Sequence, residues 1–219
     1  MRIHGRFEHG FGWQPEPSHY MERSCTALAI DGKVWLIDPE RVDGIEAELE
    51  ALGRPTGIIS LVGWHDRSVD WYAARYGIPV YGARWLRNQL FRTPLVRVDR
   101  EVPETPFQLI DTSMRGLWGW WSESALWWPE ERTLVVGDAL GSAVYFAPEH
   151  VKLGVHPISR FSTTRALDAL EPQRIYCGHG VSVTEGATEA LRRALRDGRG
   201  SPLPAWRSAV RRLWQRSRA

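Results

Sequence analysis

The sequence has too few cysteines and apolar runs that are too short for several common classes of protein. Cys25 and Cys177 are the only cysteines in 219 residues and neither belongs to a CxxC pair, so a disulfide framework is not expected. No stretch approaches the roughly 18 apolar residues that a membrane helix requires. Residues 1–13 mix charged and apolar side chains, unlike a signal peptide. We therefore expect a cytoplasmic protein with no membrane association.

The motifs of several familiar catalytic and nucleotide-binding sites are also missing. The chain contains no GxSxG nucleophile motif, no P-loop and no GxGxxG dinucleotide fingerprint. Nothing in the sequence places a base beside Cys177, which directly precedes Gly178 at the end of an apolar strand. The sequence thus gives no sign of a serine or cysteine nucleophile or of a nucleotide cradle.

Positive charge is concentrated at the C-terminus, although the net charge of the chain is only +2. Nine arginines follow Leu191, with Asp197 as the only acid. We assign residues 1–198 to one domain and 199–219 to a linker and a basic amphipathic C-terminal helix. This helix is expected to dock on the domain or on a second subunit, giving a homo-oligomer. Such a tail can attract phosphates or an acidic partner, but a solvated arginine-rich helix without a ligand is the favoured interpretation. Nucleic acid is not expected as a partner, because no nucleic-acid module is recognisable.

Short apolar runs alternate with helical patterns along the domain. The expected strands are 24–30, 33–37, 57–62, 78–81, 107–110, 124–128, 133–136 and 174–177. The expected helices are 41–52, 68–76, 148–153, 163–170 and 185–197. Strands and helices that alternate in two comparable halves predict a layered α/β protein.

Three of the apolar strands run into residues that could bind a metal ion. The strand around Ile59 leads to His65, Leu134–Val136 leads to Gly137 and Asp138, and the last strand leads to Gly178 and His179. In α/β proteins, functional sites collect at such strand ends. Two imidazoles and a carboxylate would provide three ligands for a zinc or iron ion and leave a position for water.

These motifs resemble those of the metallo-β-lactamase superfamily, in the same order along the chain. "LID" at 36–38 is similar to an early strand ending in a structural Asp, here Asp38. "TLVVGDALG" at 133–141 resembles the strand that delivers the bridging ligand Asp, and "IYCGHG" at 175–180 resembles the strand that delivers the last ligand His. The resemblance covers roughly residues 24 to 195 and implies a four-layer αββα sandwich.

The resemblance also implies that most metal-binding positions have been replaced. Residues 58–79 occupy the place of the HxHxDH loop, and the alignment puts Ser60, Val62 and Trp64 at its first three ligand positions and His65 at the last. The segment 118–123, where another ligand His would lie, contains none. The metal ligands that remain are His65, Asp138 and His179.

Two hypotheses fit this degenerate site. In the first, His65, Asp138 and His179 hold one zinc or iron ion, and the protein hydrolyses an ester, thioester, amide or phosphoester of a small molecule. Asp66 would orient the attacking water and Arg67 would clamp an anionic group. In the second, no metal binds, and the protein is a non-catalytic module that recognises a small molecule or another chain.

Tryptophans crowd the same region. Trp118, Trp120 and Trp121 precede a strand that contains Trp127 and Trp128, and Trp64 lies in the other loop. They line an aromatic pocket or fill the space of the lost ligands, and packing is the favoured interpretation. Among the other histidines, His4, His9 and His19 are expected at the surface or at an edge, and His150 and His156 are weak candidates for the site.

Overall fold

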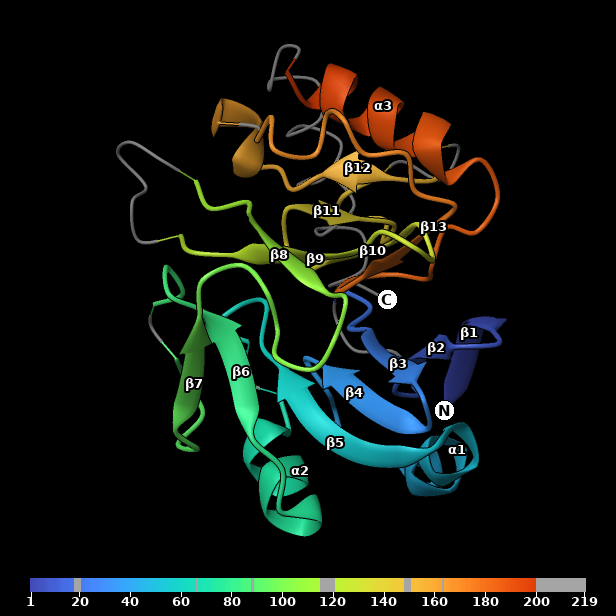
Figure 1. The fold of residues 1–219 in the computed structure, drawn as a ribbon. Helices are drawn as coiled ribbons and strands as arrows, with labels where there is room; N and C mark the ends of the chain where they lie inside the picture. The colour runs from blue at the N-terminus through green and yellow to red at the C-terminus, as the bar shows by residue number, and fades with distance from the viewer. Residues whose placement is uncertain are drawn as a thin grey trace.

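The computed structural model describes residues 1–17, 21–65, 67–87, 89–114, 121–147, 151–162 and 164–199. Most of the strands belong to two sheets that lie face to face (Figure 1). Within the described residues, the first sheet has seven strands in chain order: β1 (Arg2–Phe7), β2 (Gly10–Gln14), β3 (Cys25–Ile30), β4 (Lys33–Ile37), β5 (Arg54–Ile59), β6 (Val80–Ala83) and β7 (Leu95–Val98). The second has four in this part of the chain, in the order β13 (Arg174–Cys177), β10 (Thr133–Val136), β9 (Ser124–Trp128) and β8 (Gln108–Asp111).

Helices cover the outer faces of both sheets. These elements are α1 (Ile45–Leu52), α2 (Val69–Tyr76) and α3 (Ala187–Gly198), together with a short strand pair, β11 (Leu140–Gly141) and β12 (Gly154–Val155), and a 3₁₀ turn at Ser159–Ser162. Figure 1 shows α1 and α2 below the first sheet and α3 above the second. The layer order is helix, sheet, sheet, helix, which confirms the predicted α/β αββα sandwich.

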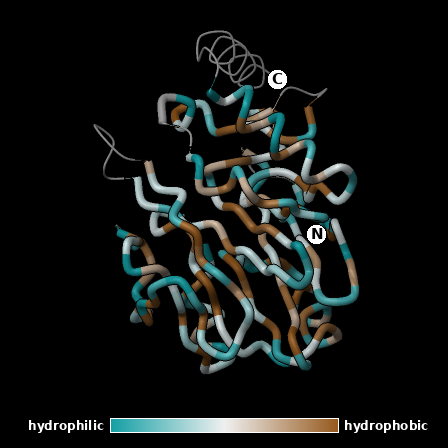
Figure 2. Tube along the Cα trace, turned by 45° about the horizontal axis from the view of Figure 1, so that its top comes forward, coloured by the Kyte–Doolittle hydropathy of each residue, from teal (hydrophilic) through white to brown (hydrophobic). Residues whose placement is uncertain are grey.

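Alternating side chains explain why the two sheets stack. Along β4, Val34 and Leu36 pack against α1 and α2, whereas Trp35 and Ile37 face the second sheet. On the far side of the second sheet, Leu134 of β10 belongs to the cluster that α3 covers. Hydrophobic residues, brown in Figure 2, accordingly run along the strands of both sheets.

Several predicted elements are confirmed and others shift by a few residues. The hairpin of β3 and β4, the strands β9, β10 and β13, and the helices α2 and α3 lie where the sequence predicts them, to within two residues. The helix predicted from residue 41 begins at Ile45, because Gly44 adopts a left-handed conformation with φ 83°. The strand predicted at 57–62 ends at Ile59. Residues 1–14 were not assigned to strands, yet β1 and β2 extend the first sheet.

Two predicted helices are wrong in the residues that the structure describes. At 148–153, the described part leads directly into β12, which pairs with β11. At 164–170, Asp168 and Leu170 make i→i−3 bonds in successive turns, and Leu167 is fully buried without forming a helix. The linker and C-terminal helix were predicted at 199–219; Arg199 caps α3, and residues 200–219 lie outside the described residues. No helix of the described residues has the length and hydrophobicity needed to cross a membrane.

Candidate metal site

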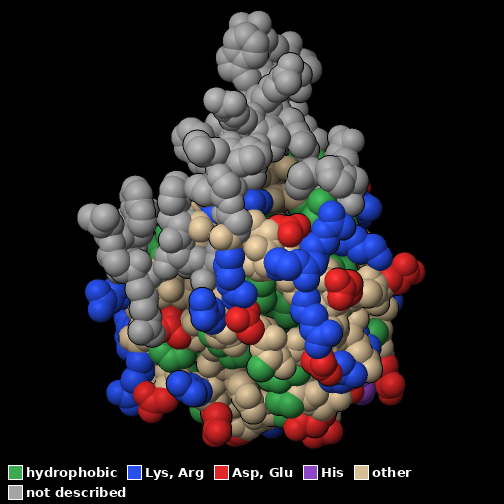
Figure 3. All heavy atoms as spheres, turned by 90° about the horizontal axis from the view of Figure 1, so that it is seen from above, with side chains coloured by type: hydrophobic (Ala, Val, Ile, Leu, Met, Phe, Trp, Pro, Cys, Tyr) green, Lys and Arg blue, Asp and Glu red, His purple; other side chains and the backbone are tan. Residues whose placement is uncertain are grey.

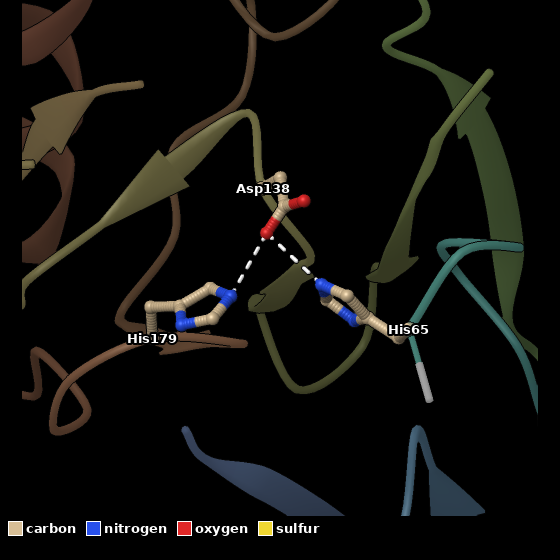
Figure 4. Close-up of side chains that lie close together, drawn as sticks. All are labelled: His65, Asp138 and His179. Carbon is tan, nitrogen blue, oxygen red and sulfur yellow. Dashed lines mark hydrogen bonds and ion pairs between the residues drawn. The ribbon is translucent and has the colours of Figure 1, made fainter. Parts of the chain in front are cut away.

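Residues from the segments that follow three strands meet at one point. β10 and β13 are parallel neighbours whose last residues are paired. Asp138 and His179, each two residues further along, therefore emerge side by side. His65 comes from the loop after β5, and a bridge between Val62 of this loop and Glu123 ties the loop to the second sheet. Figure 4 shows the two imidazole rings pointing at Asp138 from two sides.

The three side chains that the sequence predicted as ligands lie in direct contact. Nε2 of His65 and Nε2 of His179 each lie 3.0 Å from Oδ1 of Asp138. One ligand atom from each residue lies within 4.8 Å of the others, which makes this a possible metal-binding group. The side chain of His65 is 9% exposed, that of His179 is 7% exposed and that of Asp138 is 8% exposed, so solvent screens their charges little.

A hydrogen bond fixes the ring of His179 from behind, and a carboxylate lies behind the ring of His65. Nδ1 of His179 lies 2.9 Å from the carbonyl oxygen of Met21. A carbonyl can only accept, so Nδ1 carries the proton and the lone pair of neutral His179 is on Nε2, facing Asp138. Nδ1 of His65 is buried with no hydrogen-bond partner among the described residues, 3.6 Å from Oδ2 of Asp38. Asp38 in turn accepts the backbone N–H of Leu61 at 3.1 Å.

The charges of the three residues depend on one another. Burial acts to lower the pKa of His65, but the Asp138 carboxylate outweighs it and raises this pKa to about 9. Burial acts to raise the pKa of Asp138, but His65 and His179 hold it well below its ordinary value. Burial lowers the pKa of His179. A neutral His179 then turns a lone pair toward an ionised carboxylate, a contact that a cation between them would relieve.

The donor set and two of its three spacings fit a metal ion. Two imidazole nitrogens and one carboxylate oxygen are ligands that zinc and iron accept. In a tetrahedral site with bonds of about 2.0–2.1 Å, neighbouring ligand atoms lie roughly 3.3 Å apart. The two separations of 3.0 Å are close to this spacing. The carbonyl behind His179 and the carboxylate near His65 are the kind of outer partners that metal-binding histidines have.

The other oxygen of Asp138 accepts a hydrogen bond from a tryptophan. Nε1 of Trp64 donates to Oδ2 of Asp138 at 3.1 Å. The Trp64 ring meets Trp121 edge to face, with a centroid distance of 4.9 Å, and Trp121 is 5% exposed. For these two tryptophans the packing interpretation is favoured over a pocket lining. Trp118 and Trp120 lie outside the described residues.

Sequence reasoning missed Glu123, which is fully buried beside the site. Its Oε1 accepts the backbone N–H of Ala139 at 2.7 Å, and its Oε2 accepts the indole N–H of Trp121 at 3.0 Å. Burial, together with the negative charge of Asp138, raises the pKa of Glu123 to about 8. The only sequence signal is an acid immediately before the apolar strand β9.

The role expected for Arg67 needs correction. Its side chain is 1% exposed, its Nη2 donates to the carbonyl oxygen of Gly178 at 3.0 Å, and its Nη1 donates to Glu40 at 3.2 Å. Arg67 therefore holds the backbone next to His179 in place, and its guanidinium is directed into the protein instead of toward a ligand. Asp66, the other predicted catalytic residue, lies outside the described residues.

Among the described residues, the other histidines contribute no ligand to the group. His156 is buried beside Trp121, with a centroid distance of 4.9 Å, and its Nδ1 accepts the backbone N–H of Ile158. His4 lies on the edge strand β1, as expected, and bonds to Ser24 at 2.8 Å. His19 and His150 lie outside the described residues.

Solved structures share this fold over most of the chain. The DIM-1 metallo-β-lactamase exposed to ceftazidime is 12% identical, with a TM-score of 0.60, and the match covers 90% of this chain and 96% of that chain. The FIM-1 metallo-β-lactamase of Pseudomonas aeruginosa, in its mono-zinc form, is 10% identical, with a TM-score of 0.59 and coverage of 90% and 95%. TTHA1623, in a di-iron-bound form, is 19% identical, with a TM-score of 0.58 and coverage of 80% and 94%.

The sequence comparisons are negative by contrast. No protein-family model matches the chain, and no curated protein gives a significant match. At identities of 10–19% the likeness concerns the fold alone. The chain has the metallo-β-lactamase fold, with a possible metal site at the strand ends where the sequence predicted it.

Proposed function

We propose that this protein binds one zinc or iron ion through His65, Asp138 and His179 and is a metal-dependent hydrolase of an ester, thioester or phosphoester. The observation that carries the proposal is the convergence of three ligand atoms from three separate strand ends within 4.8 Å. A single ion is favoured because Ser60 and Val62, aligned with two ligand positions of the HxHxDH loop, offer no imidazole and are buried, at 1% and 0% exposure.

The chain's own residues would prepare the site in three ways. The Met21 carbonyl presents Nε2 of His179, Asp38 lies behind His65, and Trp64 holds one oxygen of Asp138 so that the other remains directed at the histidines. A zinc ion bound here would lower the pKa of its bound water to about 7 and would act as a Lewis acid for the substrate oxygen. Burial of the ligands strengthens their charge interactions with a bound cation.

Metal content is the first test. Untagged protein, purified without chelator and analysed by plasma mass spectrometry, should carry close to one equivalent of zinc or iron. His179→Ala should lose the metal, because only two of the three ligands remain in this variant. His9→Ala is the matched control, since His9 is 38% exposed and does not belong to the group of His65, Asp138 and His179; it should keep the metal. Loaded protein should then hydrolyse a chromogenic ester or thioester, and Asp138→Asn should not.

The second candidate function is a non-catalytic binding module without metal. It is favoured by the contact of Trp64 with Asp138 and by the packing of Trp121 against Trp64, which place two bulky side chains on one side of the ligand group. This candidate predicts no metal in the purified protein and none after zinc, or iron under anaerobic conditions, is added back. That result would contradict the hydrolase proposal, whereas one bound equivalent would contradict the metal-free module.

A further inference from the structure

A pocket lies at the opposite end of β10 and β13 from the candidate metal site. Asp138 and His179 follow the last residues of these strands, whereas Arg132 and Arg174 lie where the strands begin. The pocket has a volume of about 750 Å³ and is bounded by these two residues, by β1 and by the N-terminus of α3. This volume is within the range of small-molecule sites, about 300–1,000 Å³.

The lining is cationic. It contains three arginines, Arg6, Arg132 and Arg174, and includes no Asp or Glu. Each arginine pairs with a glutamate outside the lining: Arg6 with Glu48, Arg132 with Glu171 and Arg174 with Glu131. A ligand in the pocket would therefore meet the guanidinium groups and no carboxylate of the lining.

These pairs leave N–H groups for a ligand. Nε and Nη1 of Arg6, Nη1 of Arg132, and Nε and Nη2 of Arg174 have no hydrogen-bond partner among the described residues. The Arg174 guanidinium is also held in place, because its Cζ lies 4.1 Å from the centroid of the Phe7 ring, which belongs to the lining as well. A guanidinium fixed in this way loses little freedom when it binds an anion.

The first turn of α3 adds backbone donors to the same pocket. Gly186 caps this 12-residue helix without a side-chain hydrogen bond. Ala187 and Thr188 line the pocket, and their N–H groups have no acceptor in the part of the chain that is described. The positive end of the helix dipole points the same way. Figure 3 looks onto the α3 side of the molecule and shows arginine and lysine side chains among carboxylates on this face.

We propose that this pocket binds the phosphate group of a small molecule. Three arginines and a helix N-terminus converge on one space, and arginine matches the geometry of phosphate oxygens. A phosphate presents three oxygens and a charge of about −1.5 to −2 at pH 7, so it uses more of these donors than a carboxylate can. The site is separate from the metal ligands, and its occupancy does not depend on a metal.

Calorimetry and amide NMR with pyrophosphate test the proposal. The full-length protein is treated with chelator and titrated at low salt, with malonate as a carboxylate comparator. Pyrophosphate should bind more tightly than malonate, and its affinity should fall as salt is added. The amide signals of Ala187 and Thr188, which line the pocket, should shift. Arg132→Gln and Arg6→Gln should each weaken binding roughly tenfold.

Arg75→Gln is the matched control, because Arg75 also pairs with a glutamate, Glu46, but lies on α2 away from the pocket. It should leave the affinity unchanged. Arg6 is 50% exposed, so Arg6→Gln should fold even if Arg132→Gln does not. No binding at millimolar pyrophosphate, equal binding of malonate, unchanged affinity in Arg6→Gln, or shifts confined to the basic residues 200–219 would each overturn the proposal.

Discussion

Nε1 of Trp64 donates to Oδ2 of Asp138 at 3.1 Å, while His65 and His179 share the other oxygen, Oδ1. One oxygen of the Asp138 carboxylate thus bonds to the indole of Trp64, and the other faces the two imidazoles. If a metal ion takes the place between the histidines, Trp64 leaves Asp138 one oxygen to offer. We therefore expect Trp64 to set both the orientation of Asp138 and its use as a ligand through a single oxygen.

Trp64→Phe separates this hydrogen bond from packing, because phenylalanine keeps a ring against Trp121 but has no N–H. We expect the affinity for zinc, measured by competition calorimetry, to fall by roughly tenfold, since outer partners orient metal ligands. Trp121→Phe is the control, because its N–H is directed at Glu123 and not at Asp138. Equal losses in the two variants would show that affinity follows the packing of the pair and not the hydrogen bond to Asp138.

The buried carboxyl of Glu123 should make the metal-free protein less stable as the pH rises. Its pKa in the folded state, about 8, lies above the ordinary value of 4.5. The contribution of its protonated form is therefore complete below pH 4.5 and is lost as the pH rises through about 8. His65 adds a loss in the same direction, because its pKa is raised from 6.5 to about 9.

Glu123→Gln tests this dependence. The amide does not ionise, so the free energy of unfolding should fall less steeply between about pH 5 and 8, while the part due to His65 remains. At about pH 5 the variant should be less stable by about 1–3 kcal/mol, because one amide oxygen must serve two N–H donors. Urea denaturation in chelator measures both effects. Glu104 is exposed, so Glu104→Gln should keep the wild-type dependence of the free energy of unfolding on pH. The same dependence in Glu123→Gln would contradict a raised pKa of Glu123.

The sequence predicted the αββα sandwich and brought together the three candidate ligands because both depend on local signals. An apolar strand that ends in a small residue and a polar one is visible without knowing what packs on it, and parallel strands bring their ends together. Asp138 and His179 follow that rule through the paired ends of β10 and β13. The resemblance of the motifs supplied the order of the layers.

The contacts around these ligands depend on segments that are distant in sequence. Glu123 accepts the N–H of Ala139, 16 residues away, and Arg67 donates to the carbonyl of Gly178, 111 residues away. No periodicity encodes such pairs, so Glu123 was missed and Arg67 was expected to face a ligand. The wrong helix at 164–170 has a similar cause, since Leu167 is buried by α3 and its neighbours and not by a helical stripe of its own segment.

Arg67→Met should destabilise the protein by about 2–4 kcal/mol. Methionine fills much of the space of the arginine but leaves the Gly178 carbonyl without its donor and removes one partner of Glu40. Because Gly178 precedes His179, metal affinity should fall as well. Arg75→Met, in which an exposed arginine loses its pair with Glu46, should change the stability little. Wild-type stability in Arg67→Met would contradict a positioning role for Arg67.

Gly137 is required where the loop before Asp138 meets the loop that carries His65. A Cβ at Gly137 would lie 2.3 Å from Cγ2 of Val62, a fully buried residue, and 3.2 Å from Oε1 of Glu123. Gly137→Ala should therefore destabilise the protein by about 1–3 kcal/mol through overpacking and weaken metal binding by moving Asp138.

A double variant tests whether Val62 is the reason for the glycine. Val62→Ala removes the closest atom at a cost of about 2 kcal/mol. The double variant should lose less than the sum of the two, by about 1 kcal/mol. Val80→Ala, equally buried but packed toward α1 and α2, should combine additively with Gly137→Ala in the same urea denaturation series. If the Val62 and Val80 combinations behave alike, contact with Val62 is not the reason for the glycine.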